Sequence, residues 1–228
     1  DSYVAAFEEF KSQSNNILEY DGKEIKNSDE ASVMYQPEDF LLAGKARRID
    51  VALAANAVVK MQLDDMDAKY DGMPLIEIMN KFPGVGRRFE RIADGVYTDY
   101  AHHPEEIAAT MDVAKDEMGL RGKKGVVVVY QPHQNTRQHE VRNEYYDVFE
   151  GADRLYWLPT YLTREDPDLP VLVPEELIEG LKNKDVAEVA DLDDNLAKKL
   201  KRHIEDGYLV ILMTAGPADG WLRNKFAK

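Results

Sequence analysis

Four consecutive valines, at positions 126–129, restrict the fold of this chain more than any other feature. A continuous apolar run of this kind is typical of a strand buried on both faces of a parallel sheet. Further β-prone runs occur at 97–99, 154–158, 186–189 and 208–213. Segments with helical signals alternate with them, at 104–118, 136–150, 174–181 and 193–205. This alternation predicts an α/β fold with a Rossmann-like, mostly parallel sheet, right-handed crossovers and flanking helices.

The first 81 residues follow a different pattern, which predicts a mainly helical segment. An apolar stripe at helical spacing crosses residues 3–10, and Asp21-Gly22 predicts a turn in a hairpin. An alanine-rich helix is predicted over 44–61 and another helix over 74–81. A proline and a glycine then follow each other directly at positions 83 and 84. We place the domain junction there and predict two domains, residues 1–81 and 82–228.

The charge of the chain argues against nucleic acid or an anionic membrane as a partner. Its 29 basic and 43 acidic residues give a formal net charge of -14, whereas both partners require a positive face. No apolar run is long enough to span a bilayer, and the amino terminus does not read as a signal peptide. The absence of cysteine excludes disulfides and thiolate metal sites. We expect a cytoplasmic protein that handles anionic ligands through local positive charge.

Chemically versatile residues gather where two of the predicted strands end. Asp99 closes the strand at 97–99, and Tyr100 and His102 follow it. The valine strand is followed in the same way by His133 and Arg137. Ligands of open α/β sheets bind beyond the carboxyl ends of the strands, where loops from neighbouring strands form a crevice. The sequence therefore predicts a binding site built from these two segments.

Three motifs resemble the Mur ligase family of peptidoglycan synthesis. They are Gly-Val-Gly-Arg-Arg-Phe-Glu at 84–90, Asp-Tyr-Ala-His-His-Pro-Glu-Glu-Ile at 99–107 and Gln-Pro-His-Gln-Asn-Thr-Arg at 131–137. Their order and spacing are similar to those of the family's C-terminal domain. The resemblance covers residues 82–228 well. It implies that residues 1–81 are a remnant of the family's central ATP-binding domain.

The resemblance implies an ATP-dependent ligase that uses Mg²⁺ and forms an amide through an acyl phosphate. The implied substrates are UDP-N-acetylmuramate and L-alanine. No Gly-x-x-x-x-Gly-Lys-Ser/Thr loop is present, so we expect the chain to be part of a longer enzyme, inactive alone, with Mg²⁺ held mainly by the missing part. Two alternatives remain open. One is a ligase that attaches a recycled peptide to the muramate, and the other is a noncatalytic module that binds a nucleotide sugar or a protein.

For the nucleotide, the resemblance implies that Arg88 lies near the ATP phosphates, because a guanidinium fork suits phosphate oxygens. The structural alternative is a surface arginine paired with Glu90 or Asp94. Asp99 is implied to accept hydrogen bonds from the ribose hydroxyls. Its alternative is an Asx turn or a helix cap, and the two roles can coexist.

For the other substrates, Tyr100 and His102 are implied to line the pocket for the amino acid and the muramate carboxylate. His102 would donate a hydrogen bond or accept a proton from the amine, and both it and Arg88 are candidate catalytic residues. Arg137 would bind a carboxylate or phosphate bidentately beside His133. Either histidine could instead have only a local role, in a helix cap or a Pro-His turn. We predict no metal site, because the side chains of neighbouring histidines diverge.

Two segments depart from the family pattern. Gln134-Asn135 stands where the family has Arg-Tyr, which removes one positive charge. Segment 44–50 aligns with an adenine-binding motif, but Arg47 and Asp50 replace two asparagines of that motif. Arg47 and Asp50 therefore either bind adenine differently, with the arginine stacked on the base, or belong to a helix that is only structural.

Overall fold

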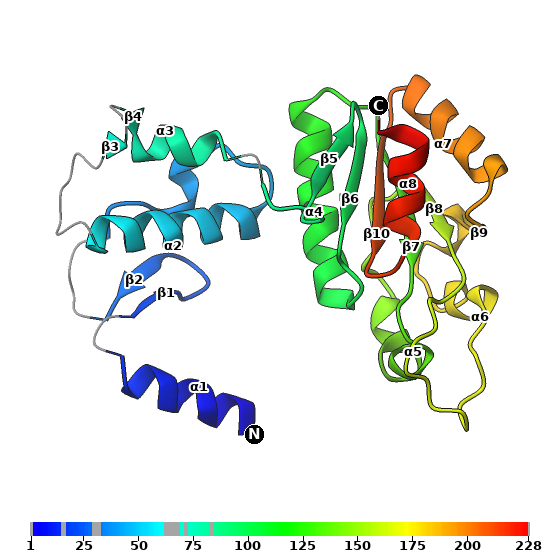
Figure 1. The fold of residues 1–228 in the computed structure, drawn as a ribbon, viewed down its shortest axis with the longest axis horizontal. Helices are drawn as coiled ribbons and strands as arrows, with labels where there is room; N and C mark the ends of the chain where they lie inside the picture. The colour runs from blue at the N-terminus through cyan, green and yellow to red at the C-terminus, as the bar shows by residue number, and fades with distance from the viewer. Residues whose placement is uncertain are drawn as a thin grey trace. The chain divides into compact units, whose positions relative to one another are not determined.

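The computed structural model describes residues 2–14, 17–28, 33–61, 69–70, 73–82 and 84–227. The chain forms two compact units, Asp1–Pro83 and Gly84–Lys228 (Figure 1). No helix among the described residues is long and apolar enough to cross a membrane. Each unit has a hydrophobic core of its own.

The first unit is mainly helical, as predicted. Its helices and strands are α1 (Ser2–Ser12), β1 (Leu18–Tyr20), β2 (Ile25–Asn27), η1 (Pro37–Asp39), α2 (Lys45–Met61), β3 (Lys69–Tyr70), β4 (Met73–Pro74) and α3 (Leu75–Asn80). The predicted hairpin is confirmed, because β1 and β2 pair in antiparallel. Asn56 on α2 is buried, and its side-chain oxygen accepts hydrogen bonds from the amides of Met34 and Tyr35 at 2.9 and 3.0 Å. The alanine-rich helix is thereby joined to the segment that precedes it.

The second unit contains a six-stranded sheet whose order is β5-β6-β10-β7-β8-β9. The strands are β5 (Glu90–Ala93), β6 (Val96–Asp99), β7 (Val126–Gln131), β8 (Arg154–Trp157), β9 (Ala187–Val189) and β10 (Leu209–Thr214). Only the edge strand β5 is antiparallel to its neighbour, and all other pairs are parallel. Every residue of the central strands β7 and β10 is buried. The valine run is therefore confirmed as a strand covered on both faces.

Helices cover both faces of this sheet (Figure 1). They are α4 (Pro104–Leu120), α5 (Asn135–Val141), η2 (Arg142–Tyr145), α6 (Pro174–Ile178), η3 (Lys184–Val186), α7 (Asp194–Glu205) and α8 (Ala218–Phe226). Leu196 and Leu200 of α7 and Leu222 of α8 pack in one cluster with Val127 and Val129. Successive side chains of a strand face opposite sides, so Val128 and Tyr130 belong to the other face. The predicted α/β class is confirmed.

Three elements of the second unit differ most from the sequence prediction. The helix expected over 136–150 ends at Val141, and η2 and turns follow it. Strand β5 was not predicted, because it is short, two of its four residues are charged, and it lies at the sheet edge. Helix α8 was not predicted either. Gly216 and Pro217, which precede it, indicate a loop, and along the helix only Ala218 and Leu222 are buried.

Candidate active site at the carboxyl end of the sheet

The loops at the carboxyl ends of four parallel strands carry the residues of the candidate site. Tyr100 and His102 follow β6, His133 follows β7, and Tyr161 follows β8. Gly216 follows the central strand β10, which lies between β6 and β7. Because the strands are parallel, these loops all lie at the carboxyl end of the sheet. The two segments singled out from the sequence therefore meet in space.

The two predicted histidines lie against each other. The rings of His102 and His133 are edge to face, with centroids 5.4 Å apart, and the centroid of the Tyr161 ring lies 5.8 Å from that of His133. His102 Nδ1 lies 3.0 Å from the carbonyl oxygen of Tyr100 and 3.2 Å from the carboxylate of Glu106. A proton on Nδ1 would be shared between these two oxygens, which leaves Nε2 as an acceptor. Such a nitrogen can take a proton from a bound amine.

His133 is suited to remain a neutral base. Burial, the imidazole of His102 and the charge of Arg137 lower its pKa below the ordinary value of 6.5. Its Nδ1 atom is buried and has no hydrogen-bond partner among the described residues. An unsatisfied buried polar atom is costly, so a ligand or water that reached it would be stabilised there.

Two adjacent arginines have different surroundings. Arg87 is partly buried, with its guanidinium 4.5 Å from the centre of the Tyr100 ring, and it donates a hydrogen bond to the carbonyl oxygen of Thr214 at 2.7 Å. Arg88 is exposed, and its guanidinium lies 5.9 Å from the same ring. Within the described ranges Arg88 forms no ion pair. The pairing considered from sequence is not present, because Glu90 binds Arg223 and Asp94 binds Arg91 and Lys123.

Asp99, the last residue of β6, is 6% exposed. One carboxylate oxygen accepts a hydrogen bond from the amide of Phe89 at 2.6 Å, and the other accepts from Ala101 at 2.8 Å and from the Thr110 hydroxyl at 3.2 Å. Burial raises the pKa of Asp99, and these hydrogen bonds oppose the rise. The structural alternative for Asp99 is thus present, and its ribose contact stays a prediction.

Arg137 lies on the first turn of α5 and is half-buried. In the described part of the chain its guanidinium has no ion-pair partner, and its charge acts on His133. The neighbouring Gln134-Asn135, where a positive charge was expected, has a structural role. Asn135 is buried and bonds the carbonyl of Pro170 at 3.0 Å and the amide of Leu172 at 2.9 Å. It holds the loop after β8 against α5.

The remaining predicted residues, Arg47 and Asp50, belong to the first unit. Both lie in the first two turns of α2, Arg47 half-buried and Asp50 exposed. The side chain of Ala46 lies outside the described residues. The adenine role proposed for this segment stays a prediction.

Sequence reasoning missed Tyr161 as a part of the cluster, and it named Arg87 as a source of positive charge without a site role of its own. The signal for Tyr161 was available, because the residue lies just past the end of a predicted strand, as His102 and His133 do. Gly216 was missed as well. An added Cβ there would lie 2.6 Å from the side-chain oxygen of Gln131 and 3.1 Å from the Tyr161 ring. Only the fold shows that there is no room for a side chain at Gly216.

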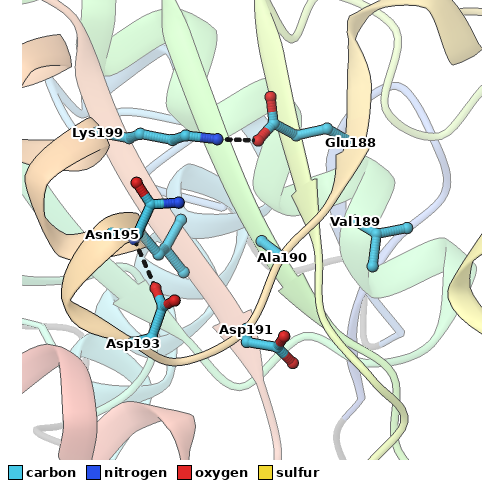
Figure 2. Close-up of a pocket in the computed structure, with 8 residues that line it drawn as sticks. Glu188, Val189, Ala190, Asp191, Asp193, Asn195 and Lys199 are labelled. Carbon is cyan, nitrogen blue, oxygen red and sulfur yellow. Dashed lines mark hydrogen bonds and ion pairs between the residues drawn. The ribbon is translucent and has the colours of Figure 1, made fainter.

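A separate pocket lies between the end of β9 and the start of α7 (Figure 2). In it Lys199 forms an ion pair with Glu188, and Asp193 caps α7 by accepting from the amide of Leu196 at 2.8 Å. Lys199 and Glu188 therefore neutralise each other, and Asp193 is already bound to a backbone amide. This pocket contains no histidine or arginine, so we place the candidate site at the histidine cluster instead. Among the described residues no three acidic or histidine side chains are grouped to hold a metal ion.

Comparisons with known proteins identify one matching family model and several relatives. The family model described as "Mur ligase, glutamate ligase domain" matches residues 87–216. A UDP-N-acetylmuramate–L-alanine ligase of Nitratidesulfovibrio vulgaris is 36% identical over 148 residues, which are 62% of this chain and 32% of that protein. The enzyme of the same name from Trichlorobacter lovleyi is 35% identical over 172 residues, 72% of this chain and 35% of that protein. The chain thus spans about a third of the length of these relatives.

Solved structures that match this chain include a domain of a putative UDP-N-acetylmuramate:L-alanyl-gamma-D-glutamyl-medo-diaminopimelate ligase from Haemophilus ducreyi. It has a TM-score of 0.38 and 22% identity, and the match covers 61% of this chain and 95% of that one. A murein peptide ligase from Psychrobacter arcticus has a TM-score of 0.45 and 18% identity, covering 94% of this chain and 45% of that one. The chain belongs to the Mur ligase family, and residues 87–216 are its match to the family's glutamate ligase domain.

Proposed function

We propose that this chain is the C-terminal portion of an ATP-dependent ligase that joins L-alanine to UDP-N-acetylmuramate. The observation that carries the proposal is the meeting of Arg88, His102, His133 and Arg137 at one edge of the sheet, in a chain whose relatives bear that ligase name. We further propose that residues 1–81 belong to the central ATP-binding domain. The activity then belongs to the full-length protein and takes place in the cytoplasm.

The reaction would proceed in two steps. The γ-phosphoryl group of ATP is first transferred to the muramate carboxylate, which gives an acyl phosphate and ADP. The amine of alanine then attacks the carbonyl carbon and releases inorganic phosphate. The exposed guanidinium of Arg88, free of ion pairs with described residues, would bind phosphate oxygens as their charge shifts. Arg137 would hold the carboxylate of the incoming alanine. Both arginines thus act through charge rather than covalent chemistry.

The two histidines would prepare the amine. Alanine arrives as an ammonium ion and must lose a proton before it can attack. His102 Nε2 is the acceptor that its Nδ1 contacts leave open. The lowered pKa of His133 favours its neutral form, so this side chain would add no positive charge beside that ammonium. Because the sequence has no Gly-x-x-x-x-Gly-Lys-Ser/Thr loop, we assign Mg²⁺, which would neutralise phosphate charge, mainly to the part of the ligase outside this chain.

The test is phosphate release by the full-length protein with ATP, Mg²⁺ and UDP-N-acetylmuramate. Three reactions are compared, with L-alanine, with an L-Ala-D-Glu-containing peptide, and without an amine. Release that depends on L-alanine supports the proposal. Release that depends on the peptide would instead indicate a recycling ligase, and no release with either would indicate a noncatalytic module that binds a nucleotide sugar or a protein.

The role of Arg88 has a matched control three residues away. Arg88→Ala in the full-length protein should lower turnover about 100-fold or more, because charge stabilisation at the phosphate is lost. Binding of UDP-N-acetylmuramate should change little. Arg91→Ala removes another exposed arginine, one that pairs with Asp94, and should leave turnover nearly unchanged. Equal turnover in the two variants would remove Arg88 from the phosphate site.

A further inference from the structure

We propose that Glu90, Asp219 and Arg223 form a clamp that positions the turn bearing Arg88. We call these three residues the α8 clamp. The inference rests on the proposed function only for what Arg88 does once it is positioned. None of the three residues was singled out from the sequence as a site residue, and Asp219 and Arg223 lie beyond the end of the family match at residue 216.

The turn that presents Arg88 has an unfavourable backbone. Arg87 and Phe89, on either side of it, have φ angles of 57° and 47°, in the left-handed region that non-glycine residues rarely adopt. Such a conformation persists only where the surrounding structure holds it. Here the holding groups are carboxylates, since Glu90 accepts from the Arg87 amide at 2.8 Å and Asp99 accepts from the Phe89 amide at 2.6 Å.

Glu90 is in turn held by the last helix. Arg223 donates to both oxygens of the Glu90 carboxylate, at 3.0 and 2.5 Å, so the pair is bidentate. The Nε atom of Arg223 donates to Asp219 at 2.9 Å, and Asp219 also accepts from the Thr98 hydroxyl at 2.7 Å. The hydrogen bond from Arg223 is the main cause that lowers the pKa of Glu90 to about 2. Glu90 therefore remains an ionised acceptor for the turn.

These contacts connect α8 to the arginine turn by a short path. The guanidinium of Arg223 orients Glu90, Glu90 fixes the Arg87 amide, and the next residue is Arg88. Arg87 adds a second link, because its Nε lies 3.9 Å from the carboxylate of Asp219. An error of about 1 Å in the position of a reacting or binding group can cost about 100-fold in rate. Arg223 is thus a positioning residue, which acts on the reaction through Arg88.

The experiment compares Arg223→Ala with Lys225→Ala, because both remove an ion pair of α8. Lys225 pairs with Asp194 of α7 at 2.7 Å and forms no hydrogen bond or ion pair with the turn among the described residues. In the full-length ligase, Arg223→Ala should lower kcat about 10-fold or more, and the KM for UDP-N-acetylmuramate should stay unchanged. Added guanidinium should restore part of the lost kcat. Lys225→Ala should leave both constants unchanged.

Backbone amide hydrogen exchange supplies a readout that does not depend on activity. In the 228-residue chain, Arg223→Ala should speed exchange of the Arg87 and Phe89 amides about 10-fold or more, while the amides of the buried strand β10 stay protected. Equal exchange and equal kcat in the two variants would overturn the clamp. Faster exchange throughout β10 would also overturn it, because Arg223 would then stabilise the whole unit.

The same measurements separate failure of the clamp from failure of the proposed function. If Arg88→Ala keeps full turnover, the proposed role of Arg88 fails, and amide exchange alone decides whether the clamp exists. If Arg88→Ala abolishes turnover while Arg223→Ala behaves like Lys225→Ala, only the clamp fails.

Discussion

Tyr145 lies in a buried hydrogen-bond network behind the two histidine loops. Its hydroxyl donates to the side-chain oxygen of Gln138 at 2.8 Å and shares a hydrogen bond with the Tyr130 hydroxyl, also at 2.8 Å. Gln138 donates to the carbonyl of His133 at 3.1 Å, and Tyr130 reaches the carbonyl of His102 at 3.4 Å. Burial raises the pKa of Tyr145 to about 12, so the hydroxyl keeps its proton. We expect Tyr145→Phe to destabilise the second unit.

The magnitude follows from the two hydrogen bonds that are lost. Each contributes about 1 kcal/mol to stability, and a buried oxygen left without a donor costs about 1–3 kcal/mol. Because Tyr130 and Gln138 keep other contacts, we expect a loss of roughly 2–3 kcal/mol in the free energy of unfolding. For a unit of this size, about 2–4 °C per kcal/mol corresponds to a drop of roughly 5–10 °C in Tm.

The assay is urea unfolding followed by tryptophan fluorescence, which reports this unit alone because both tryptophans, Trp157 and Trp221, lie in it. The ring of Trp157 is 5.4 Å from that of Tyr145, so its emission should also change in the folded variant. Tyr146→Phe is the matched control, because Tyr146 is 56% exposed. If the two variants unfold within about 0.5 kcal/mol of each other, the network does not contribute as argued.

Three further predictions test the surroundings of the site. The pKa of Glu90 is lowered to about 2 from an ordinary 4.5, so the folded protein should lose stability as pH falls from about 4.5 to about 2. Glu90→Gln should lack this loss in urea unfolding at about pH 5 and about pH 3. The positive charge of Arg137 helps to lower the pKa of His133, so Arg137→Gln should raise that pKa in an NMR titration of the imidazole. An unchanged pKa would mean that the guanidinium lies too far away. Gly216→Ala should cost about 1–3 kcal/mol in thermal unfolding, because the added methyl meets a side-chain oxygen and a tyrosine ring. Gly220→Ala, where nothing lies within 4 Å, should cost nothing, and equal costs would refute the confinement of Gly216.

The parallel sheet could be predicted because its signals are local. Val126–Val129 are apolar without interruption, and Leu196 and Leu200 repeat at helical spacing, so strand and helix followed directly from periodicity. Strand β5 and helix α8 have weak patterns, and their positions depend on contacts with distant residues such as that between Glu90 and Arg223. Sequence periodicity does not report contacts between residues that are far apart in the chain.

The candidate site divides in the same way. The strand-end rule placed His102 and His133 near each other, since it needs only the direction of the strands. This rule did not distinguish the environments of Arg87 and Arg88. Arg87 is partly buried against the Tyr100 ring, whereas Arg88 is exposed. That difference arises from the left-handed turn and from the carboxylates that hold it.

The sequence by itself determined the fold class, the family resemblance and the segments that carry the chemistry, because periodicity and motifs lie in neighbouring residues. Only the tertiary structure decided which polar groups are bound within the protein and which are left without a partner. Asp99, Glu90 and Asn135 are engaged in holding loops, whereas His133 Nδ1 has no hydrogen-bond partner among the described residues. The physical reason is that hydrogen bonds and burial depend on distance in space, which a folded chain sets between residues far apart in sequence.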